Sequence, residues 1–489
     1  MKDRKITKAL EKLTVYELNS FRKFLLSPYF NQNEAFVIFF DMLNEAKRTG
    51  KDPGQIESRD VWARIYGTDT PYNDVKFRKL SSDLFALFEE FITQKELDND
   101  GSEKLRLLMK AYTNRNLSDL FGSLIHHIEY NKKLHQNKNA EHYLNMYNIE
   151  RAIMDINFHD NTIGRKVEMD KVLNVEEMSY NLDVFFIAEK LRSYCTLLSW
   201  NQTFKLNKKI IGIDVILKLA QSPFFKDYPP IAIYYLISVI KSHEGNTEDY
   251  YKLKDLLIAN LHHFDKKEGK DLLDLVIGYC IGLANKNLPE FGGEALAWYK
   301  IGLERDIIIR DEHISPTTFR NIVLYALREG EYEWTEIFIQ EYAKFLDPTV
   351  RESNVNFSLA RVEWYNKNYK RVIQLLAYTD YKEVFQALLS RTLLLLSYYE
   401  LNETESLESL FSSFKLYLDR EKTLTKQRKE QYYSLIKFTR ALTKIQSSNK
   451  VKLSKLKMEI EKKEAIVNKN WILEKINEKI KILTTFKSL

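Results

Sequence analysis

The densest group of residues that could bind a metal or transfer a proton lies between positions 126 and 142. It comprises four histidines and two glutamates, His126, His127, His135, His142, Glu129 and Glu141. A zinc ion needs ligands that converge to about 2 Å from each donor nitrogen. On one helix, however, His135 and His142 are two turns apart, about 10 Å along the axis. The pattern therefore favours solvated histidines on a helix surface, and we predict no metal site.

Other residue patterns that carry catalytic chemistry are missing from the sequence. It contains no glycine-rich phosphate loop, no His-Glu-x-x-His and no Cys-x-x-Cys. The adjacent His262 and His263 point to different sides of a helix. Cys195 and Cys280 lie in apolar helical stretches and are typical of small buried hydrophobic residues. We therefore predict no catalytic residue, no cofactor and no enzymatic activity, with an enzyme whose site is scattered over several helices as the alternative.

The composition favours helices over strands. Glycine and proline number only 15 and 9, about 3% and 2% of 489 residues, against roughly 7% and 5% in average proteins. A hydrophobic fraction of 44% and a charged fraction of 29% indicate a folded chain. Residues 1–13 are charged and amphipathic, unlike a signal peptide. The longest apolar run, Leu275 to Ala284, is far below the roughly 20 residues that cross a bilayer, so we expect a cytoplasmic protein without a membrane span.

Loop-forming residues divide the chain into four parts. These are an N-terminal helical domain, an irregular helical region, a region of helical repeats and basic amphipathic C-terminal capping helices, over residues 1–97, 104–225, 231–440 and 441–489. The first boundary is the run from Leu97 to Glu103, which is rich in Asp, Asn and Gly. A further loop is expected from Asn157 to Arg165.

The third part contains a repeated two-helix unit. Gly330, Asn368 and Asn402 each stand between two helical runs, 38 and 34 residues apart. That interval is typical of a helical hairpin with its connection in a stacked-repeat protein. Because so short a hairpin cannot bury its apolar face alone, it must stack on its neighbours. The sequence thus predicts an all-α fold, a right-handed α-solenoid of two-helix repeats with an N-terminal helical cluster.

From about Ile231 to Asp419, and most clearly from Phe319 onward, the chain resembles the tetratricopeptide repeat family. The similarity rests on hairpin length, on the turn residues, and on large side chains and a proline at matching positions, Trp364, Tyr398, Phe411 and Pro348. It departs from the family at Leu395 and Leu407, where Gly and Ala are expected. The resemblance implies a scaffold, adaptor or assembly factor that binds another protein or a peptide.

In the resembled family, the first helix of each repeat lines the partner-binding groove. Alignment of this chain places the partner-binding candidates at Arg320, Leu324, Leu327, Tyr365 and Tyr399, beside Val362, Thr392 and Leu396. This set lacks the Lys and Asn residues with which the family grips a terminal carboxylate, so we do not expect binding of chaperone tails. Two alternatives stay open: an apolar or aromatic peptide binds the groove, or the protein's own helices fill it.

The C-terminal segment is strongly basic. Residues 441–489 contain twelve Lys, five Glu and no Arg, a net charge of +7 against +6 for the whole chain. An apolar stripe recurs along it at helical spacing, through Leu453, Leu456, Ile460, Val467, Trp471, Ile476, Ile480 and Leu483. The last repeat of a solenoid needs such amphipathic helices as a cap. We predict capping, with Trp471 largely buried against the helix that carries Tyr432; binding of nucleic acid or an anionic surface, and self-association, are the alternatives.

Overall fold

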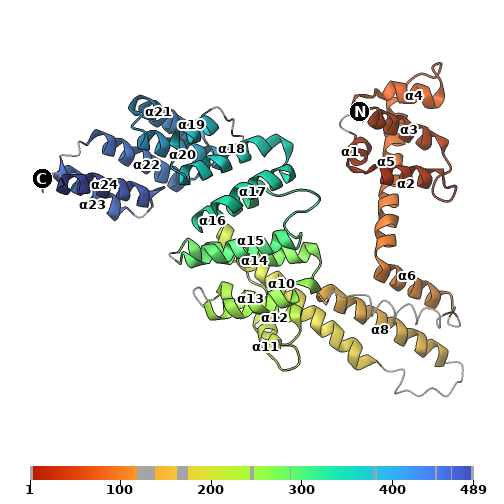
Figure 1. Ribbon diagram of the computed structural model, residues 1–489. Helices are drawn as coiled ribbons and strands as arrows, with labels where there is room; N and C mark the ends of the chain where they lie inside the picture. The colour runs from red at the N-terminus through yellow and green to blue at the C-terminus, as the bar shows by residue number, and fades with distance from the viewer. Residues whose placement is uncertain are drawn as a thin grey trace. The chain divides into compact units, whose positions relative to one another are not determined.

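The computed structural model describes residues 4–117, 120, 138–161, 174–242, 247–286, 288–377, 379, 381, 383–445, 449–463 and 465–485. Over these residues the chain is helical and contains no strand, which confirms the predicted all-α class (Figure 1). None of the described helices is both long and apolar enough to cross a membrane. The chain divides into two compact units, Met1–Arg192 with Gly212–Tyr234, and Ser193–Ile211 with Tyr235–Leu489.

The first unit begins with a cluster of five α-helices. They are α1 (Lys5–Lys12), α2 (Val15–Leu26), α3 (Glu34–Arg48), α4 (Ser58–Tyr66) and α5 (Asp74–Asn99). Phenylalanine rings fill the space between them, and Phe21 meets Phe40 edge to face at 5.2 Å between centroids. The Thr14 side chain caps α2, as its sequence position predicts, because its hydroxyl accepts a hydrogen bond from the Glu17 backbone N–H.

Two segments of this unit that were expected to be loops are partly helical in the structure. The Leu97 to Glu103 boundary is a sharp junction, where Asp100 ends α5 and its side chain caps α6 (Gly101–Asn114). Helix α8 (Ala140–Asn161) runs through the first half of the loop expected from Asn157 to Arg165, and residues 162–165 lie outside the described residues. Asn and Asp cost only about 0.7 kcal/mol or less in a helix, so the Asn and Asp residues from 157 to 161 are compatible with the helix that α8 forms there.

The first unit also contains most of α10 (Val175–Phe204), all of α11 (Ile213–Ala220) and the start of α12 (Pro229–Ser242). The second unit continues with twelve α-helices, of which the first six are α13 (Thr247–Asn260), α14 (Lys266–Ala284), α15 (Glu290–Glu304), α16 (Pro316–Arg328), α17 (Tyr332–Tyr342) and α18 (Pro348–Tyr365). The remaining six are α19 (Tyr369–Leu376), α20 (Val384–Glu400), α21 (Thr404–Arg420), α22 (Lys426–Lys444), α23 (Lys450–Lys462) and α24 (Lys469–Thr485). From α14 onward each helix packs on the next, and α16 also packs on α18 and α18 on α20.

Helices α16, α18 and α20 end in the same kind of turn. The left-handed residues are Gly330 (φ +81°), Lys367 (φ +59°) and Asn402 (φ +56°). In each turn the next residue donates its backbone N–H to the carbonyl five residues earlier, at 2.8 to 2.9 Å, which is the Schellman pattern. The expected turn at Asn368 is thus displaced by one residue, because Asn368 is the N-cap of α19 instead.

The basic C-terminal helices are part of the core of the second unit. Leu453, Ile460, Ile472 and Ile476 are fully buried, and α24 packs on both α22 and α23. Trp471 is only partly buried, contrary to expectation. Its ring meets that of Tyr399 edge to face at 5.1 Å, and its indole N–H donates to Glu400 at 2.8 Å. The next residue, Ile472, takes the inward position, because successive residues are rotated by about 100° around a helix.

Candidate binding pocket beside helices α18 to α20

Among the residues singled out for metal or thiol chemistry, those that the structure describes form no metal-binding group and no disulfide. His126, His127, His135 and Glu129 lie outside the described residues. Within the described ranges, no group of three His, Cys, Asp or Glu is placed to hold a metal ion. Cys195 and Cys280 are both buried and form no disulfide. Burial raises the pKa of both thiols, that of Cys280 to about 12, so both stay protonated and unreactive at neutral pH.

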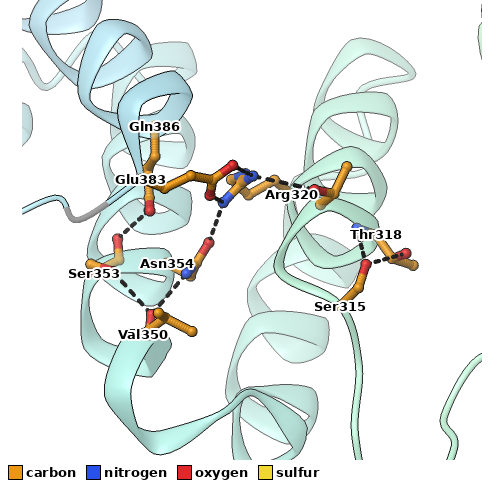
Figure 2. Close-up of polar contacts among 9 residues, drawn as sticks. Ser315, Thr318, Arg320, Val350, Ser353, Asn354, Glu383 and Gln386 are labelled. Atoms are coloured by element: carbon orange, nitrogen blue, oxygen red, sulfur yellow. Dashed lines mark hydrogen bonds and ion pairs between the residues drawn. The ribbon is translucent and has the colours of Figure 1, made fainter. Parts of the chain in front are cut away.

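A polar network joins α16, α18 and the start of α20 (Figure 2). Arg320 of α16 is buried, and its Nη1 donates to Asn354 Oδ1 at 2.8 Å and to Glu383 Oε2 at 2.9 Å. Its Nη2 donates to the other Glu383 carboxylate oxygen at 3.2 Å. Such a two-point contact between a guanidinium and a carboxylate fixes both distance and orientation. Glu383 immediately precedes α20, so the pair ties α16 to the N-terminus of α20.

Two amide side chains complete this network. The Asn354 amide donates to the Val350 carbonyl at 2.8 Å, and the Gln386 amide donates to the Ser353 carbonyl at 3.0 Å (Figure 2). Asn354 and Gln386 are themselves buried, so their polar atoms need these partners. These hydrogen bonds therefore fix the N-terminal part of α18 and that of α20 relative to each other.

A pocket of about 500 Å³ lies next to the network. Its walls come from α18, from α19 with the segment after it, and from the start of α20, and they consist of Thr349, Val350, Glu352, Ser353, Asn356, Gln374, Leu375, Thr379, Glu383 and Gln386. Eight of these ten side chains are polar, and two are carboxylates. The volume lies in the range of ligand-binding pockets, roughly 300 to 1,000 Å³. The lining offers many hydrogen-bond acceptors and suits a ligand that carries N–H groups.

The predicted partner-binding residues are distributed differently. Arg320 reaches the edge of the pocket through Glu383, whereas Leu327 is buried in the core and Leu324 is partly buried. Tyr365 is exposed, with its ring 6.1 Å from that of Tyr332. Tyr399 is covered by Trp471, so the chain's own helix α24 occupies the surface at that end.

Sequence reasoning identified none of the ten pocket-lining residues, although one signal was present. Thr349, Ser353 and Asn356 are all polar and follow the three- and four-residue steps of one helix face. On a first helix of a repeat, such a face is expected to be covered by the next hairpin. A polar face at that place indicates a recess that is open to solvent or to a ligand.

A second recess of about 730 Å³ follows one face of α22. Its charged lining residues are five basic and two acidic, Lys415, Lys437, Arg440, Lys444, Lys463, Asp419 and Glu430. Lys437 pairs with Glu459 and Arg440 with Glu408. Lys415, Lys444 and Lys463 form no ion pair with any residue that the structure describes. This basic recess, defined by those five basic residues, is suited to an anionic ligand.

Comparisons with known proteins leave the chain without a match: no family model, no curated protein and no solved structure is similar to it. The resemblance to the tetratricopeptide repeat family therefore rests only on hairpin length, on the turn residues, and on the large side chains and the proline at matching positions.

Proposed function

We propose that this chain is a non-catalytic scaffold or adaptor that binds a protein partner in the polar pocket beside α18, α19 and α20. The observation that carries the proposal is the pocket of about 500 Å³. Arg320 contacts both Asn354 of α18 and Glu383 at the start of α20, and these contacts fix the two helices that form most of the pocket wall. A site held in shape by buried hydrogen bonds loses little conformational entropy on binding. Recognition of a segment of another protein is the use that this geometry supports best.

The scaffold that we propose is a right-handed, tetratricopeptide-like solenoid, and the helix contacts support its stacking of two-helix repeats. Contacts between successive helices, together with those of α16 with α18 and of α18 with α20, are what stacked two-helix repeats require. The three matching turns at Gly330, Lys367 and Asn402 support the same arrangement, because they recur at repeat-length intervals.

The lining of the pocket supports binding over catalysis. It contains hydroxyl groups at Thr349, Ser353 and Thr379, but none of its ten side chains is a His, Lys or Cys that could activate a hydroxyl. The carboxylate of Glu352 is exposed and forms no ion pair among the described residues. A partner segment with a Lys, an Arg or free backbone N–H groups would complement this lining.

Site-specific photocrosslinking tests the proposal. We expect a benzophenone amino acid at Gln374, an exposed residue of the pocket wall, to crosslink one partner protein in the native cell. The same group at Glu405, exposed on α21, is the control and should not capture that partner. Replacement of Asn356 by Lys should remove the Gln374 crosslink. Equal capture from both positions, or none from Gln374, would contradict the proposal.

The basic recess along α22 favours nucleic-acid binding as a second candidate function. Deleting the tail cannot test it, because α23 and α24 carry core residues such as Ile460 and Ile472. Replacing Lys415, Lys444 and Lys463 together by Gln leaves that core intact. If RNA or DNA binds there, the triple variant should reduce the slope of log affinity against log salt by about three, roughly one per lost phosphate contact. An unchanged slope, or no binding by the parent at low salt, would reject this candidate.

A further inference from the structure

Arg361 of α18 is a partly buried cation without a counter-ion among the residues that the structure describes. Its guanidinium carbon lies 5.8 Å from the centre of the Phe357 ring, and it forms no hydrogen bond or ion pair with any residue within the described ranges. The contrast with Arg320 is sharp, because the buried guanidinium of Arg320 has a carboxylate, an amide and a hydroxyl as acceptors. A charge withdrawn from water without a partner destabilises the folded state, so its presence needs an explanation.

The helix register places a second arginine beside Arg361. The hydrogen bond from Arg320 to Asn354 aligns α16 with α18, and the Tyr332 and Tyr365 rings meet near the C-terminal ends of the same two helices. Arg361 follows Asn354 by seven residues and Arg328 follows Arg320 by eight, which is about 10 to 12 Å in a helix. Arg328 and Arg361 therefore lie at the same level. Arg328 is exposed, and its guanidinium carbon lies 5.6 Å from the centre of the Tyr325 ring.

The ionisable groups around Arg361 do not compensate its charge. Burial, together with repulsion from Arg328 and Arg320, lowers the pKa of Arg361 to about 10. The neighbouring Tyr365 and Tyr325 act in the opposite direction, but as phenols they are neutral at pH 7. The guanidinium stays protonated at neutral pH, so a positive surface remains between the C-terminal turns of α16 and α18.

We propose that Arg361 and Arg328 bind the carboxylate of an acidic side chain in the partner segment. This inference rests on the proposed partner-binding function and adds the chemistry of the partner to it. A planar guanidinium offers two parallel N–H groups that match the two oxygens of a carboxylate. The polar pocket lies at the N-terminal ends of α18 and α20 and the two arginines lie near the C-terminal ends of α16 and α18. A partner segment that crosses α18 would thus place N–H groups at one end and an acidic residue at the other.

A short acidic peptide tests the site without knowledge of the partner. The probe is an acetylated, amidated tetraglutamate, titrated by calorimetry at constant ionic strength, with tetraglutamine and inorganic phosphate as comparison ligands. We expect saturable binding of tetraglutamate that weakens about tenfold or more in Arg361→Gln, the loss typical of a charge-assisted hydrogen bond. The control Arg420→Gln, at an exposed position on α21, should bind as the parent does.

Several outcomes would overturn the site. These are no saturable binding by the parent, equal binding of tetraglutamine, equal weakening in Arg420→Gln, or phosphate binding as tightly as the peptide, which would indicate a site for free oxyanions. Failure of the Gln374 crosslink with intact tetraglutamate binding would reject the proposed partner pocket and keep the arginine site. The reverse result would keep the pocket and reject the arginine site.

Thermal stability separates ligand binding from a purely structural role. If Arg361 only stabilises the C-terminal end of α18 through the helix dipole, Arg361→Leu should lower the Tm. If it is an uncompensated charge kept for a ligand, Arg361→Leu should leave the Tm unchanged or raise it. Tetraglutamate should then raise the Tm of the parent and not that of the variant, because a ligand stabilises only the state that it binds. A lowered Tm without ligand would contradict the proposal.

Discussion

The buried guanidinium of Arg320 depends on the carboxylate of Glu383, which is itself half exposed. Glu383→Ala leaves Arg320 with Asn354 as its main acceptor, so a largely buried charge loses its counter-ion. We expect the free energy of unfolding to fall by about 1 to 3 kcal/mol. Urea denaturation followed by circular dichroism measures the loss.

Glu352 provides the matched control, since it is an exposed carboxylate of the same pocket. Glu352→Ala should change the free energy of unfolding by no more than about 0.5 kcal/mol. Similar losses in the two variants would show that the Arg320 contacts do not contribute to stability beyond those of a surface charge.

The capping box of α2 predicts a local pH dependence. The Thr14 backbone N–H donates to the Glu17 carboxylate at 2.9 Å, and this bond, with that of the Thr14 hydroxyl, lowers the pKa of Glu17. A carboxyl whose folded pKa is lowered contributes stability above its unfolded pKa of about 4.3, and this contribution is lost as the pH falls through the folded value. Glu17→Gln should therefore destabilise α2 by less than about 1 kcal/mol at pH 7, and the difference from the parent should shrink as the pH falls below the unfolded pKa.

Hydrogen exchange of the α2 amides at pH 7 and pH 3 measures this difference. Glu11→Gln, at an exposed position on α1, serves as the control and should show no pH-dependent difference. A Glu17→Gln effect of the same size at both pH values would contradict the role of the charge.

At the scale of helices, the sequence shows where a helix ends when the residue type at the end is distinctive. Gly330 and Asn402 tolerate positive φ, so the turns at these positions were predictable. Lys367 has no such preference, and the sequence therefore pointed to its neighbour Asn368. The pocket was beyond prediction because its walls come from three segments between Thr349 and Gln386. The sequence shows that each segment has a polar face, but only the packing of the three segments determines that these faces line one pocket.

Helix α24 yields a prediction about two adjacent residues. Ile472 is fully buried, whereas the larger Trp471 is partly exposed. Side-chain size alone would make Trp471 the more costly residue to truncate, and burial would make it Ile472. We expect Ile472→Ala to reduce the free energy of unfolding by about 2 to 5 kcal/mol. Trp471→Ala should cost less, about 1 to 3 kcal/mol, for one aromatic contact and one hydrogen bond. Urea denaturation of both variants decides the order, and a larger loss at Trp471 would mean that α24 is held mainly through Tyr399 and Glu400.

At the scale of the whole molecule, the two compact units should respond separately to local damage. From α14 onward the strongest contacts join successive helices, so a defect in α24 should spread through its neighbours first. We expect Ile472→Ala to accelerate hydrogen exchange in α20 to α24 and to leave exchange in α1 to α5 unchanged. Faster exchange in α1 to α5 would show that the chain unfolds as one cooperative body.

The contact between Arg320 and Glu383 has a mechanical consequence. It joins residues 63 positions apart, with the whole of α17, α18 and α19 between them in the chain. Helices that contact mainly their neighbours in sequence separate one contact at a time when the ends of the chain are pulled. Because this contact joins α16 to the start of α20, we expect α16, α18 and α20 to separate together and to resist extension more than their neighbours do. Under load we expect the flanking helices to separate first, while the pocket beside α18 keeps its shape.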